Sequence, residues 1–279
     1  MCIRDRYSDI DVNTYANTWL YSNNFPTKEA YEVLRTSDFM NSYLALASER
    51  RRPLFSKLEK FSKLMQGVYN PYLVREAIEQ LLPYSNVPDV GNLFRKAIAT
   101  RDTQLISPIL TLGKAIPPAL EPDLRELLAH NSYQLQYEVL YLLWNNFEEH
   151  KYTYLEMTKD QQGDNLSNVR LLWLLLALNT EGFSKEQYTS FYNELSAYTS
   201  LNAPVETRVK AFECLNLIKN FSDESLRNLV VATQHPNWRF NRFSTRLITE
   251  IISDSEIKKR LLRINGELPQ KVKNILKEK

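Results

Sequence analysis

The stretch from Pro204 to Ile252, PVETRVKAFECLNLIKNFSDESLRNLVVATQHPNWRFNRFSTRLITEII, predicts the fold class of the whole chain. Three runs follow one another in which apolar residues recur three and four positions apart, the spacing of a helix that buries one face. The predicted buried faces are Val205, Val209, Phe212, Leu215 and Ile218, then Leu226, Leu229 and Val230, then Phe240, Phe243, Leu247 and Ile251. Ser222 and Asp223 can supply cap oxygens for the second helix. Pro236 suits the first turn of the third helix.

The same alternation of helical patterns and breakers extends along the chain. Further helices are predicted over 9–21, 27–35, 37–49, 90–99, 104–112, 118–130, 132–149, 166–179, 184–198 and 269–278. Ser184 with Gln187 and Ser253 with Glu256 form capping-box patterns at two helix starts. Helix pairs recur loosely at about 30–45 residues, near the period of HEAT and armadillo-like repeats. The predicted fold is therefore all-α, an irregular α-solenoid of antiparallel helix pairs.

Composition excludes several classes of partner. The 279 residues include 35 Lys and Arg against 33 Asp and Glu, a formal charge of +2, which argues against a nucleic-acid partner. No apolar run approaches the roughly 18 residues of a membrane-spanning helix, so no membrane span is expected. The two cysteines, Cys2 and Cys214, define neither a disulfide framework nor a zinc-ligand cluster.

The sequence contains none of the catalytic motifs that we searched for. His130, His150 and His235 are the three histidines, and none belongs to a His-Glu-x-x-His helix. A catalytic zinc needs three converging protein ligands, so these histidines are expected not to bind metal. We therefore expect no catalytic residue, metal site or cofactor within this chain.

One constellation of charge stands out. Arg239, Arg242 and Arg246 recur at three and four positions and form a cationic stripe on the third helix of the opening stretch. By spacing alone, an exposed face or a set of internal salt bridges fits the stripe better than a ligand site does.

Two segments carry a family resemblance. The segment 236–247, PNWRFNRFSTRL, resembles the late helix of leukotriene-hydrolase-type zinc aminopeptidases of the M1 family, and WLYSNNFP at 19–26 resembles their entry into the C-terminal helical domain. The resemblance implies that Arg239 and Arg242 receive the carboxylate of a short peptide substrate. It places Asn237 where the family has a first basic residue. Trp19 and Tyr21 would anchor the helices to a catalytic domain.

The chain is expected to divide into three parts, of which the resemblance implies the second and third. Residues 1–6, MCIRDR, have the form of a translated sequencing adapter and are expected to be a non-native leader. Residues 7–26 would connect to a catalytic domain outside this sequence, and 27–279 would form the helical repeat domain. The parent enzyme would be a zinc metallo-aminopeptidase, a hydrolase, whose partners here are its own catalytic domain and a short peptide. The chain alone would be inactive. The alternative is a freestanding α-solenoid that binds a protein partner. The sequence leaves open the compartment, cytoplasmic or periplasmic, along with residue preference and oligomeric state.

Overall fold

The structure is a computed structural model that describes residues 58, 77–113, 115–164, 167–264 and 268–278. Within these residues every regular element is a helix and there is no strand, so the all-α prediction is confirmed. The predicted anchors Trp19 and Tyr21, and the predicted helices over 9–21, 27–35 and 37–49, lie outside the described residues. The chain divides into two compact units, Met1–Leu127 and Leu128–Lys279.

The described part of the first unit is a small helical cluster. Its elements are η3 (Leu82–Tyr84), α6 (Pro88–Ala99), α7 (Thr103–Leu110), η4 (Pro118–Leu120) and α8 (Glu121–Glu126). Helix α6 packs against α7, η4 and α8, and its Val90 and Phe94 are fully buried. Asp102 begins α7 because its side chain accepts a hydrogen bond from the Gln104 amide.

The second unit is longer and contains the candidate site. After η5 (Leu127–Ala129), its elements are α9 (Tyr133–Asn146), η6 (Glu148–His150), α10 (Lys151–Thr158), α11 (Val169–Leu178), α12 (Lys185–Ala197), α13 (Val205–Leu217), α14 (Asp223–Ala232), α15 (Trp238–Ile251), α16 (Ser255–Ile264) and α17 (Gln270–Glu278). Consecutive helices pack against each other in five places: α9 with α10, α10 with α11, α11 with α12, α12 with α13, and α14 with α15.

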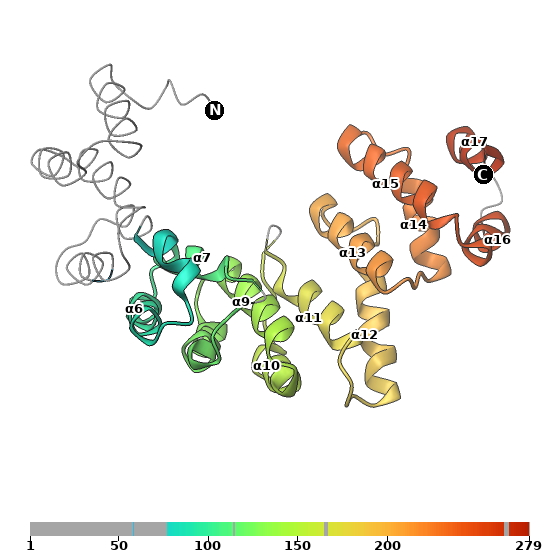
Figure 1. Cartoon of the computed structure of the whole chain (residues 1–279). Helices are drawn as coiled ribbons and strands as arrows, with labels where there is room; N and C mark the ends of the chain where they lie inside the picture. Colours follow the sequence, from blue (N-terminus) through green and yellow to red (C-terminus); the bar gives the residue numbers. More distant parts are fainter. Residues whose placement is uncertain (1–57, 59–76, 114, 165–166, 265–267, 279) are drawn as a thin grey trace, which may run out of the picture. The chain divides into compact units, whose positions relative to one another are not determined.

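Alternate helices of this unit also pack side by side. Helices α9, α11, α13, α15 and α17 form one row of neighbours, and α12, α14 and α16 form another (Figure 1). Helix α11 lies between α9 and α13 and is buried at seven of its ten residues, which agrees with its nearly uniform apolar sequence. This order is consistent with stacked helix pairs, while the solenoid itself stays an interpretation.

Two helix starts were predicted correctly from side-chain caps. Ser184 and Gln187 form the capping box, with each side chain accepting a hydrogen bond from the other residue's backbone amide. Ser222 caps α14 through the Ser225 amide. Asp223 does not act as a cap, because its carboxylate accepts hydrogen bonds from Arg260 of α16.

Other helix boundaries differ from the predictions. The helix predicted over 132–149 ends at Asn146, and Phe147, with φ −127° and ψ 82°, leaves the helical conformation. Helix α10 was missed because its sequence, KYTYLEMT, lacks a clear apolar period. The helix predicted over 118–130 is divided into η4, α8 and η5. Asp254, and not the predicted Ser253, caps α16.

The buried face of α13 is also rotated from the predicted one. Phe212 and Leu215 are buried as expected, but Val205, Val209 and Ile218 are only half-buried. The residues that replace them in the buried face are Thr207, Arg208, Ala211 and Cys214. The side chain of Arg208 is thus buried, while that of the next residue, Val209, which apolar spacing had placed in the buried face, is only half-buried.

Candidate anion-binding site

The first turn of α15 is organised by Asn237. Its Oδ1 accepts hydrogen bonds from the backbone amides of Arg239 at 3.1 Å and Phe240 at 3.3 Å, which makes Asn237 the N-cap residue. Pro236 therefore precedes the helix. The sequence pattern had placed it in the first turn, and that prediction is wrong. A basic side chain at position 237 could not accept these hydrogen bonds, so the asparagine has a local structural role.

The apolar face of α15 fixes where its arginines point. Phe240, Leu247 and Ile251 are buried and Phe243 is half-buried, close to the predicted face. Since successive helical residues are about 100° apart, this burial turns the opposite face outwards.

Arg239, Arg242 and Arg246 are exposed on that outward face, and we call them the cationic row. No salt bridge among the described residues involves any of the three. The only acidic residue of α15 is Glu250 in its last turn, and its carboxylate accepts a hydrogen bond from Asn216 of α13. Within the described residues, the cationic row does not form internal salt bridges, so that alternative is not supported there.

Two further side chains contact residues of α15 near the cationic row. Trp238 is 65% exposed, and the guanidinium carbon of Arg239 lies 5.5 Å from the centroid of its ring. Lys271 of α17 donates a hydrogen bond from Nζ to Asn241 Oδ1 at 2.7 Å. The first turns of α15 therefore hold an exposed aromatic ring beside Arg239 and, at Asn241, a further ammonium group.

Behind the same turn lies a buried arginine. Arg208 of α13 is only 3% exposed, and its guanidinium carbon lies 4.7 Å from the centroid of the Phe240 ring. Its Nε donates to the backbone oxygen of Thr199 at 3.3 Å, while its Nη2 is buried and has no hydrogen-bond partner among the described residues. Burial lowers the pKa of this guanidinium because the charged form loses its hydration. Nothing in the sequence pattern signalled that this arginine would be buried.

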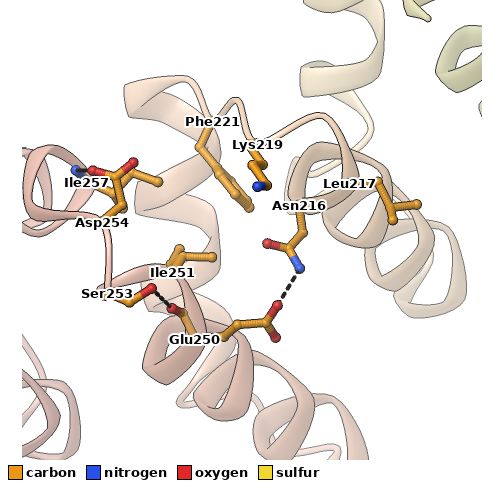
Figure 2. A pocket seen from close by; sticks show the side chains of 9 residues that line it. All are labelled: Asn216, Leu217, Lys219, Phe221, Glu250, Ile251, Ser253, Asp254 and Ile257. Carbon is orange, nitrogen blue, oxygen red and sulfur yellow. Dashed lines mark hydrogen bonds between the residues drawn. The ribbon is translucent and has the colours of Figure 1, made fainter.

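A pocket of about 550 Å³ opens where α13 and α15 end (Figure 2). Phe221, Ile251 and Ile257 supply its apolar surface. Figure 2 shows the Glu250 side chain directed towards Asn216 across it. Lys219 also lines the pocket and has φ 52°, the left-handed conformation that usually favours glycine. The carboxylates of Glu250 and Asp254 already accept hydrogen bonds within the protein, which leaves little chemistry to define a ligand.

A second pocket, of about 710 Å³, lies at the start of α9 and is lined by Tyr133, Tyr137 and Asp164 among others. The loop beside it requires Gly163, whose φ is 87° and whose Cβ, if present, would overlap the backbone oxygen of Ser167. Burial raises the pKa of Tyr137.

The histidines have structural roles in the described part of the chain. His130 Nδ1 accepts the Ser132 amide, and His235 Nδ1 accepts the Asn237 amide. The His150 ring lies edge-on to the Tyr154 ring. No group of three His, Cys, Asp or Glu side chains among the described residues is placed to hold a metal ion.

The comparisons with known proteins add no identification. No protein-family model, no curated protein and no solved structure matches the chain. Within the described residues, no helix is both long enough and apolar enough to cross a membrane.

Proposed function

We propose that this chain is the C-terminal helical domain of a zinc aminopeptidase similar to the leukotriene-hydrolase type. In this role it covers the catalytic cleft of its parent enzyme and helps to position short peptide substrates. The zinc and its ligands would belong to the catalytic domain, because the described residues of this chain offer no ligand set. The chain by itself would have no peptidase activity.

The proposal is supported by the resemblance of 19–26 and 236–247 to two segments of that family, and one structural observation carries it. Arg239 and Arg242 are exposed on α15 and have no carboxylate partner among the described residues. A guanidinium group binds a carboxylate through two parallel hydrogen bonds, and this geometry suits the free C-terminus of a peptide.

The test replaces Arg239 in the full-length parent enzyme. A hydrogen bond to a charged group is worth about 1.5–3 kcal/mol, so Arg239→Ala should lower kcat/KM for tri- and tetrapeptides by roughly ten- to a hundredfold. Peptides with a C-terminal amide should be hydrolysed at nearly the original rate. Lys185→Ala, a change at an exposed cation on α12, is the matched control and should affect neither substrate. Equal losses on free and amidated peptides would show that Arg239 only supports the fold.

The alternative function is a freestanding scaffold that binds a protein partner. The observation in its favour is the open pocket at the ends of α13 and α15, whose apolar lining includes Phe221, Ile251 and Ile257. The genomic sequence upstream of Tyr7 discriminates between the two functions. An in-frame His-Glu-x-x-His helix with a glutamate ligand further on supports the peptidase, and a stop codon followed by a new start codon supports the scaffold.

A further inference from the structure

The cationic row is longer than one carboxylate requires. With a rise of about 1.5 Å per residue, Arg239 and Arg246 are separated by about 10 Å along the axis of α15, with Arg242 between them. A single carboxylate can engage one guanidinium bidentately and cannot span that distance. The length of the row therefore indicates a ligand with more than one anionic group.

The row is also unfavourable for the helix that carries it. Like charges three and four residues apart destabilise a helix by about 0.2–0.5 kcal/mol per pair. Arg239 also lies in the first turn, where the helix dipole disfavours a cation, and that turn contains no acidic residue. Since no described carboxylate pairs with the row, bound anions would offset these costs.

The surroundings of the row suit a peptide. Trp238 presents an exposed ring beside Arg239, and tryptophan and arginine are the side chains most enriched in binding hot spots. Lys271 adds a cation through its contact with Asn241. In an extended peptide, alternate side chains lie about 6.6 Å apart on one face. Successive arginines of the row are about 4.5 and 6 Å apart along the helix axis, so carboxylates at alternate positions come within reach of these long, flexible side chains. The formal charge of only +2 for the whole chain favours a peptide over a nucleic acid.

We propose that the cationic row binds a peptide segment carrying two or three acidic side chains. This extends the carboxylate role proposed above for Arg239 and Arg242 and rests on the same surface. It makes acidic oligopeptides the ligand class. It requires neither the catalytic domain nor a free peptide C-terminus, so it can be tested on this chain alone.

The test measures fluorescence anisotropy of a dye-labelled peptide, Ser-Glu-Gly-Glu-Gly-Glu-Ser, with both ends blocked, against this chain at low salt. The comparison ligands are the same peptide with glutamine for glutamate, that glutamine peptide with a free C-terminus, and an oligothymidylate of equal charge. We expect the triacidic peptide to bind more tightly than all three, and its affinity to fall as salt is raised.

Variants then locate the binding. Arg242→Gln and Arg246→Gln should each lower the affinity for the triacidic peptide by about two- to fivefold, the range for exposed ion pairs. The triple variant that includes Arg239→Gln should lower it by about ten- to a hundredfold. Lys185→Gln on α12 is the matched control and should change nothing. Helical circular dichroism of each variant verifies folding.

Each contrary outcome has a distinct meaning. Equal binding of the acidic and glutamine peptides overturns the proposal, and so does an equal effect of Lys185→Gln. Tighter binding of the oligothymidylate would make the row a phosphate-binding surface instead. If the glutamine peptide with a free C-terminus binds as tightly as the triacidic peptide, the acidic-segment proposal fails while the terminal-carboxylate role of Arg239 stands.

Discussion

Replacing Arg208 by methionine should not destabilise the protein, although the side chain is almost completely buried. Methionine keeps an unbranched apolar stem in the space between α13 and α15 and removes the charge. Burying an ion costs several kcal/mol even after relaxation, and that cost is recovered only if the ion is well paired.

The contacts of Arg208 recover only part of this cost. Its hydrogen bond to the Thr199 oxygen, at a long 3.3 Å, is worth about 1.5 kcal/mol, the low end for a charged group. Its position over the Phe240 ring adds about 0.5–2 kcal/mol. Nη2, which has no hydrogen-bond partner among the described residues, destabilises the folded protein by about 1–3 kcal/mol. We therefore expect Arg208→Met to leave the free energy of unfolding unchanged or to raise it by about 1–3 kcal/mol. Arg208→Ala should lower it, because the stem packing is lost as well.

Because the chain forms two compact units, the assay should resolve them. Urea unfolding followed by circular dichroism gives the overall change, and native-state hydrogen exchange of α13 and α15 peptides assigns it to the second unit. Arg242→Met, a change at an exposed arginine, is the control and should remain within about 0.5 kcal/mol of the original protein. If Arg208→Met lowers the free energy of unfolding by more than about 2 kcal/mol, and the dependence of that free energy on urea concentration is unchanged, the stated balance of energies is refuted.

Three further predictions test the second unit. Lys219→Gly should raise the free energy of unfolding by about 0.5–1 kcal/mol, because Lys219 ends α13 with φ 52°, and Lys219→Ala should give no gain in the same urea titration. Burial raises the pKa of the Cys214 thiol to about 12, so little of the reactive thiolate is present at pH 8. In a Cys2→Ser background, iodoacetamide at pH 8 should therefore label the folded protein at least about a hundredfold more slowly than the urea-unfolded protein. Equal labelling rates would mean that Cys214 is accessible. Arg170 Nε and Nη2 donate to the two carboxylate oxygens of Glu194 at 2.7 and 2.6 Å. A double-mutant cycle with Arg170→Met and Glu194→Gln should give a coupling free energy of about 1 kcal/mol. This value is below the range for buried ion pairs because Glu194 is partly exposed. A coupling near zero would show that solvent screens the pair.

The sequence by itself determined the features that depend on local spacing. Apolar residues three and four positions apart located most helices of the second unit, because a helix must bury one stripe whatever it packs against. Ser184 and Ser222 marked helix starts, since a cap oxygen acts on amides only two or three residues away. The exposure of the cationic row followed from the same periodicity. Where the period was weak, as in α10, prediction failed.

Only the tertiary structure decided what depends on neighbours distant in sequence. The spacing of α13 favoured Val209 in its buried face, but contacts with Thr199 and Phe240 bury Arg208 instead. Asp223 looked like a cap, yet Arg260, 37 residues further on, takes its carboxylate. Whether the cationic row was paired could not be read from spacing, because a salt-bridge partner can come from any helix that packs nearby. These choices depend on which helices become neighbours, and periodicity within a single helix does not encode that.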